Sequence, residues 1–198
     1  MRLEREDIQA YLTADEIVQS DHTTIASAAK RLCQRAKGSI EKAKTLFEWV
    51  RDEISHSNDA NRTEVTCSAL EVLESGTGAC YAKSHLLAAL LRAEGIPAGF
   101  CYQIFSEDHN HDAAHGLNGI FLDELEKWIR IDPRGNTSGC DQPAEFDLGS
   151  ERARLAFPDL EFFDDVIYAS PRQEIVSSLQ KHEDRATLWK DLPRLSRK

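Results

Sequence analysis

The sequence lacks the features that would place the protein in a membrane or lead it out of the cell. No stretch approaches the ~18 consecutive apolar residues that span a bilayer. The opening residues MRLERED carry too many charges to lead into the apolar part of a secretory signal peptide. We therefore expect a cytoplasmic protein with no membrane partner.

Paired cysteines are also missing. The cysteines are odd in number, none stands in a CxxC pair, and they are Cys33, Cys67, Cys80, Cys101 and Cys140. Neither a disulfide framework nor a zinc knuckle is indicated, so each cysteine has to be interpreted alone. A buried structural role is the plain expectation for Cys33 and Cys101.

Positive charge is in short supply. The chain has 24 Lys and Arg against 34 Asp and Glu, a formal net charge of −10 that repels phosphate backbones and anionic membrane surfaces. We therefore expect no nucleic-acid partner. Internal repeats and low-complexity linkers are absent as well, and 198 residues can bury a real core without disulfide or metal staples.

Helical periodicity is present in several stretches. Apolar residues recur every three or four positions over about residues 22–37, 39–54 and 80–94, and the third stretch stops at Gly95. A further terminal helix is predicted over about 171–188. The polar segment 55–66 has no sustained period and is predicted to be a surface loop.

Strand patterns follow the helices. Apolar residues alternate over 100–105, and two short strands over 115–122 and 127–132 flank four residues that suit a hairpin loop. Helices first and antiparallel strands after predict an α+β fold with N-terminal helices packed on an antiparallel sheet.

Cys80 has the surroundings of a nucleophile. It begins the third predicted helix, where the positive end of the helix dipole stabilises a thiolate. Gly76 and Gly78 just before it allow a sharp turn and the close approach of a substrate backbone. The alternative is a small hydrophobic residue that closes a helix start. The coincidence of helix start and flanking glycines favours the nucleophile.

His115 and Asp132 are the candidates for its base and for the group that orients the base. If the hairpin is centred on its loop, Leu117 lies opposite Asp132, and His115 becomes a diagonal neighbour of Asp132 at ~7 Å. A one-residue shift would separate the two onto opposite faces. Alternatively, Asp132 is only a turn residue before Pro133. His85, about 140° round the helix from the cysteine, is expected to point elsewhere as a surface or half-buried residue.

These residues resemble a known family. The segment SGTGAC that ends at Cys80, the run LLAALLRAEGIPA, the pair His115-Gly116 and the segment from Trp128 to Asp132-Pro133 are similar to the motifs of the transglutaminase-like superfamily. The resemblance covers about residues 20–135, and the whole chain is similar to short bacterial transglutaminase-like cysteine peptidases. It implies one domain over 1–198 with its core at about 20–135 and a C-terminal extension at about 136–198.

The resemblance also implies a papain-like active site. Cys80 would be the nucleophile on a helix N-terminus, His115 the base on a strand, and Asp132 the orienting group on the next strand. The reaction implied is acyl transfer from a peptide or protein amide through a thioester, with no cofactor and no metal. The backbone N–H of Cys80 would be one oxyanion donor, and position within the family puts the second in the region 54–57.

Two other functions stay open at this point. One is a catalytically silent module of the same fold that holds a peptide in its groove. The other is a zinc site between His109 and His115, because alternate residues of an extended chain share a side; its candidate ligands are Asp108, His109, His111, Asp112 and His115. A solvated loop is the alternative there, since no HExxH spacing supports a metal.

Overall fold

The structure of the protein is a computed structural model that describes residues 1–106, 112–135 and 144–196. Within them the elements follow in the order β1 (Arg2–Leu3), η1 (Ile8–Tyr11), α1 (Thr23–Leu32), α2 (Gly38–Glu53), β2 (Ser55–His56), α3 (Ala69–Ser75), β3 (Thr77–Gly78), α4 (Cys80–Ala93), β4 (Ala98–Ser106), β5 (Asp112–Leu122), η2 (Asp123–Leu125), β6 (Lys127–Ile131), η3 (Arg152–Arg154), β7 (Glu161–Phe162), β8 (Val166–Ile167), α5 (Gln173–Lys181) and α6 (Arg185–Lys190).

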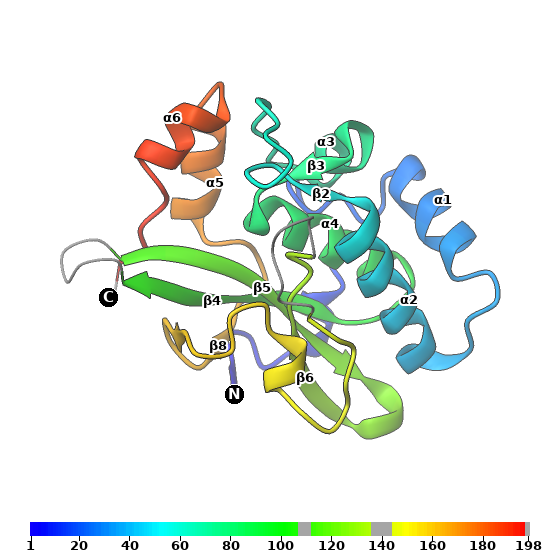
Figure 1. Cartoon of the computed structure of the whole chain (residues 1–198). Coiled ribbons are helices and arrows are strands. Elements are labelled where there is room, and N and C mark those ends of the chain that lie inside the picture. The colour runs from blue at the N-terminus through cyan, green and yellow to red at the C-terminus, as the bar shows by residue number, and fades with distance from the viewer. Residues whose placement is uncertain (107–111, 136–143, 197–198) are drawn as a thin grey trace.

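The largest sheet of the described residues is antiparallel and has the strand order β6-β5-β4-β7, and the N-terminal helices lie against it (Figure 1). Two short parallel ladders, β1 with β8 and β2 with β3, lie outside this sheet, and isolated bridges join further pairs of residues. The α+β fold predicted from the sequence is confirmed.

Helix α4 lies at the centre of the fold. Every residue from Cys80 to Arg92 is buried, because α1, α2, α3 and strand β5 all pack against this helix (Figure 1). The helical spacing of its apolar residues predicts one buried face for this helix, whereas the structure buries all of its faces. A helix that is apolar nearly all round belongs in a core, and the run LLAALL has this character.

The β5–β6 hairpin has the register that the sequence predicts. Asn118 pairs with Ile131 and Leu122 pairs with Lys127, so the next position outward sets Leu117 against Asp132. Glu126, at φ 49°, closes the loop in the left-handed conformation. His115 and Asp132 therefore project from the same face of this hairpin.

Several elements differ from the expectations, and β5 begins at Asp112 rather than at residue 115. Helix α1 ends at Leu32 rather than near residue 37. The single terminal helix predicted over 171–188 is two helices, because Asp184 caps a new start by accepting from the backbone N–H of Thr187. The segment predicted as a surface loop contains strand β2, where His56 is only 5% exposed.

The second face of the sheet is covered by segments from both ends of the chain. Tyr11, Cys101, Leu117 and Ile167 form a small apolar cluster there. Cys33 is buried in the main core, so the expectation of buried positions for Cys33 and Cys101 is confirmed. Among the described residues no helix is both long and apolar enough to cross a membrane.

Candidate active site

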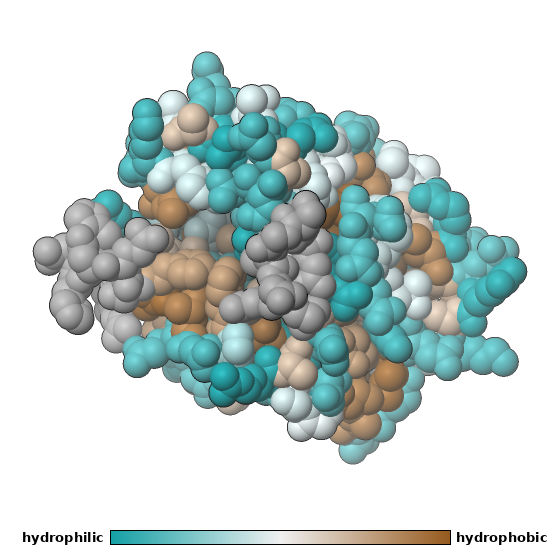
Figure 2. All heavy atoms as spheres, in the orientation of Figure 1, coloured by the Kyte–Doolittle hydropathy of each residue, from teal (hydrophilic) through white to brown (hydrophobic). Residues whose placement is uncertain are grey.

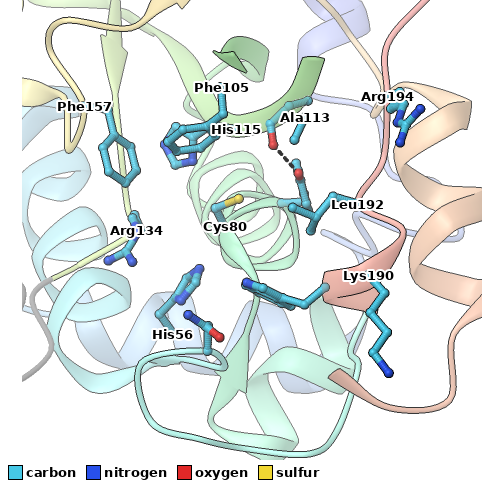
Figure 3. Close-up of a pocket in the computed structure, with 14 residues that line it drawn as sticks. His56, Cys80, Phe105, Ala113, His115, Arg134, Phe157, Lys190, Leu192 and Arg194 are labelled. Carbon is cyan, nitrogen blue, oxygen red and sulfur yellow. Dashed lines mark hydrogen bonds between the residues drawn. The ribbon is translucent and has the colours of Figure 1, made fainter. Parts of the chain in front are cut away.

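A pocket of about 480 Å³ opens where the start of α4, the hairpin of β4 and β5, and helix α6 meet (Figure 3). Its size lies in the range of small-ligand and substrate pockets, roughly 300–1,000 Å³. In the space-filling view, apolar atoms gather in a hollow where β4 and β5 pass below α5 and α6 (Figure 2). Cys80 and His115 both line this pocket.

Cys80 occupies the first turn of α4, which has no side-chain cap, and its residue is 8% exposed. Gly76 ends α3 at φ +65°, so the predicted sharp turn is present. At Gly78 the need for glycine has a different cause from the predicted approach of a substrate backbone. A Cβ there would lie 3.1 Å from Ala82 Cβ and from Thr66 Oγ1, so this glycine admits the protein's own atoms rather than a substrate backbone.

His115 and Asp132 are in contact. His115 Nε2 lies 2.8 Å from Asp132 Oδ2, and both side chains are buried. The same carboxylate also accepts from the backbone N–H of Arg134 at 3.0 Å and of Ala156 at 2.9 Å. Asp132 is thus a turn residue through Oδ1 and the partner of the histidine through Oδ2. Since Nε2 is occupied, Nδ1 is the ring nitrogen left to face Cys80.

Gly116 brings the nucleophile helix onto the strand of the base. A Cβ on Gly116 would lie 2.9 Å from a ring carbon of Tyr81 and 3.1 Å from its Cα. Because Tyr81 follows Cys80 directly, the missing side chain lets the start of α4 rest on β5 beside His115. The Tyr81 hydroxyl also donates to the Ala114 carbonyl, which ties the two elements together (Figure 3).

A second histidine, His56, lies on the other side of Cys80 (Figure 3). The parallel pairing of β2 with β3 sets His56 beside Gly78, two residues before the cysteine. Its Nδ1 lies 3.6 Å from Asp59 Oδ2, and its ring is close enough to interact with the thiol of Cys80. Sequence reasoning pointed to the region 54–57 but did not single out this residue, because a two-residue strand has no detectable period.

The charges at the site favour a thiolate. Burial alone would raise the pKa of Cys80, but the charge of His115 and hydrogen bonds from His115 and His56 lower it to about 6. Burial would lower the pKa of His115, and the charges of Asp132 and Cys80 outweigh it, raising this pKa to about 10. For Asp132, burial raises the pKa, yet the neighbouring His115 holds it below its usual value. Both shifts favour the thiolate–imidazolium form of the pair over its neutral form.

Aromatic rings shield the histidine from water. The centroid of Phe157 lies 4.9 Å from that of His115 and 4.8 Å from that of Phe105, all in edge-to-face geometry. His115 is consequently 1% exposed although it lines the pocket. Exclusion of water strengthens its interaction with Asp132.

The far wall of the pocket comes from the C-terminal region. Trp189 stands edge-on to His56 at 6.0 Å, and Leu192 points toward Cys80 (Figure 3). This wall is anchored at both ends. Arg185 binds the carbonyl of residue 62 and two asparagines, while the N–H of Ala114 donates to the Pro193 carbonyl at 3.2 Å.

The remaining candidates lie elsewhere or outside the described residues. His85 does point away from Cys80, but it is buried rather than at the surface; its Nδ1 lies 2.7 Å from the Cys67 carbonyl, and burial lowers its pKa to about 4. Cys140 is outside the described residues, as are three members of the proposed zinc cluster, Asp108, His109 and His111. No group of three or more metal-ligating side chains occurs among the residues that are described.

The chain also matches a family model. The model of the transglutaminase-like superfamily matches residues 26–133, more than half of the chain. The chain belongs to the transglutaminase-like superfamily. This family includes thiol-dependent peptidases and acyltransferases. The match contains Cys80, His115 and Asp132, and no curated protein sequence matches the chain.

Solved structures also match part of the chain. A proposed cysteine protease from Cytophaga hutchinsonii has a TM-score of 0.55 and 22% identity, covering 66% of this chain and 43% of that protein. The periplasmic domain of TgpA from Pseudomonas aeruginosa has a TM-score of 0.49 and 19% identity, covering 64% of this chain and 47% of that one. The chain thus spans less than half the length of either, and the likeness to the first concerns the fold alone.

Proposed function

We propose that the protein is a thiol enzyme that transfers the acyl group of a peptide or protein amide. The observation that carries the proposal is that Cys80 and His115 line one pocket, while the buried Asp132 lies behind the histidine with its Oδ2 2.8 Å from His115 Nε2. A thiolate beside an imidazolium whose other nitrogen is held by a carboxylate is the arrangement that nucleophilic catalysis by cysteine needs.

The reaction has two steps. The Cys80 sulfur attacks the amide carbonyl carbon, and the C–N bond then breaks as His115 Nδ1 gives its proton to the leaving amine. This leaves an acyl thioester on Cys80. In the second step His115 takes a proton from water, which releases a carboxylic acid, or from an amine, which releases a new amide. Asp132 keeps Nε2 protonated throughout, so that Nδ1 always serves the reacting atoms.

The oxyanion formed in each step needs two donors. The backbone N–H of Cys80 is the first, because no side chain caps the start of α4. His56 is the second in this proposal. Its imidazole reaches the sulfur from the side opposite His115, so that a ring N–H can donate to an oxyanion formed beside the thiol.

The test is a search for the thioester. The protein is incubated with a panel of glutamine-containing peptides and dipeptides, and intact-mass spectrometry looks for an acyl adduct that hydroxylamine removes. Cys80→Ser should lose the adduct, while Cys101→Ser, a buried cysteine on the other face of the sheet, should keep it. Peptide binding without any adduct, and unchanged by Cys80→Ser, would favour the silent binding module instead.

A further inference from the structure

Lys83 is a buried cation one helical turn after the nucleophile. Its side chain is 0% exposed, which is rare for lysine unless its charge is satisfied. Nζ donates to three backbone carbonyls, those of Ile54 at 2.5 Å, Arg134 at 2.9 Å and Arg51 at 3.3 Å. An ammonium group has three N–H donors, so these contacts use all of them.

The three carbonyls belong to segments that hold the other site residues. Arg51 lies in the last turn of α2, and Ile54 is the residue that leads from α2 into β2. The next but one residue after Ile54 is His56. Arg134 closes the turn after β6, and its own N–H donates to Asp132 Oδ1. Lys83 thus touches the backbone of both segments that flank the thiol.

We propose that Lys83 is a positioning residue of the active site, which fastens the His56 segment and the Asp132 turn onto the nucleophile helix. This inference rests on the function proposed above and adds a fifth residue to Cys80, His115, Asp132 and His56. Lys83 does not contact the substrate. It holds the carbonyls of residues 54 and 134 in place. In this way it fixes the distances of His56 and His115 from the thiolate.

The space around the ammonium group is matched to it. A Cβ on Gly135, at φ +86°, would overlap the Arg51 carbonyl oxygen and lie 2.9 Å from Nζ. Only glycine allows the turn to close this tightly over the lysine. We call the surroundings of Nζ, which are the three carbonyls and Gly135, the lysine cage. The lysine cage is formed by α2, by the turn after β6 and by α4 together.

Opposing effects around Lys83 act on the pKa of its ammonium group. Burial lowers the pKa of Lys83 to about 7; the carboxylates of Asp132, Asp52 and Asp59 oppose this shift, and the charge of Arg134 adds to it. The carbonyls favour the protonated form, because a neutral amine has only two N–H groups to offer them. Loss of the proton would leave one of the three carbonyls without its donor.

The experiment measures the rate at which iodoacetamide labels Cys80 as a function of pH. Wild type should show a thiolate that forms near pH 6. Lys83→Met keeps the length of the side chain and removes its donors, so His115 should be held less well, and the midpoint should rise by about one pH unit. At pH 6 this shift corresponds to a roughly fivefold lower labelling rate.

The matched control is Arg92→Met. Arg92 is another buried cation of α4, and it donates to the carbonyls of Thr13, Ala98 and Ala169 at the far end of the helix. This variant should lose stability, seen in the thermal midpoint, and keep the wild-type labelling profile. If Lys83→Met does not fold, Gly135→Ala perturbs the same cage from the other side and should shift the profile in the same direction.

The outcomes separate the two proposals. A wild-type midpoint near 6 with unshifted profiles in the Lys83→Met or Gly135→Ala variant would overturn the positioning role and leave the proposed function intact. A shift of equal size in Arg92→Met would overturn it as well, since any loss of stability would then suffice. A wild-type midpoint in the ordinary range of a thiol, near 8.5, would refute the proposed function and this inference with it.

Discussion

Replacing Asp132 with asparagine is the sharpest perturbation of the site. Both oxygens of this carboxylate accept hydrogen bonds, Oδ1 from the N–H of Arg134 and Oδ2 from the N–H of Ala156 and from His115 Nε2. An amide has one oxygen and one NH₂ group, so one side of the new side chain must present hydrogens to a donor. At least one of the hydrogen bonds that Asp132 accepts is therefore lost in the Asp132→Asn variant.

The two orientations of the Asp132→Asn amide have different consequences. With its nitrogen toward Arg134, the amide still accepts from His115, but the imidazolium loses its carboxylate partner. With its nitrogen toward Ala156, the amide donates to His115 Nε2 and forces the proton onto Nδ1 of a neutral ring. In both cases the pKa of Cys80 should rise above about 6, because the charge of His115 is what lowers it against burial.

The magnitudes follow from the contacts. One buried N–H left unsatisfied and weaker bonds to the others destabilise the fold by about 2–4 kcal/mol. For a chain of this length that corresponds to a thermal midpoint lower by roughly 4–16 °C. In a serine triad the same change lowers turnover on the order of 10⁴-fold. We expect a smaller loss here, since a thiolate already paired with an imidazolium depends less on the third residue.

The assay combines the thermal midpoint, the pH profile of Cys80 labelling and single-turnover acylation. Asp15→Asn is the control, because the Asp15 carboxylate caps two backbone N–H groups, those of Ile17 and Val18, away from the pocket. A lower midpoint with an unchanged labelling profile and unchanged acylation per folded molecule would refute the reasoning. Asp132 would then be only a turn residue before Pro133.

Further expectations concern the thiol, its neighbours and metal. Cys80 labelling should rise with pH through about 6, whereas burial raises the pKa of Cys67 to about 12 and should keep it inert at pH 7; faster labelling of Cys67 in a peptide map would contradict the assignment. His56→Ala should lower turnover by roughly 10²–10³-fold at constant thermal midpoint, and unaltered turnover would remove it from the oxyanion site. Gly116→Ala should lift the start of α4 from β5 and raise the midpoint of Cys80 labelling, which an unshifted profile would disprove. Elemental analysis should find no stoichiometric zinc; one equivalent that is lost on replacing the histidines at 109 and 111 would restore the zinc alternative.

Much of the framework could be predicted from local patterns. Helices α2 and α4 follow from apolar residues at helical spacing, and the β5–β6 register follows from the length of the loop between two alternating segments. That register was enough to bring His115 and Asp132 to one face. The break between α5 and α6 was harder to predict, because the start of α6 depends on the cap that Asp184 supplies rather than on a change of apolar period.

The sequence alone determined the order of the motifs, and it also determined helix α4 and the β5–β6 hairpin, which carry them. Both of these elements depend on residues that are close together in the chain. The tertiary structure alone decided which side chains surround the thiol. His56 reaches Cys80 because β2 pairs with β3, and Lys83 meets three carbonyls because α2, α4 and the turn after β6 pack together. These contacts join residues 24 to 51 positions apart. Their geometry is set by the packing of whole elements, and the local periodicity of apolar residues does not predict that packing.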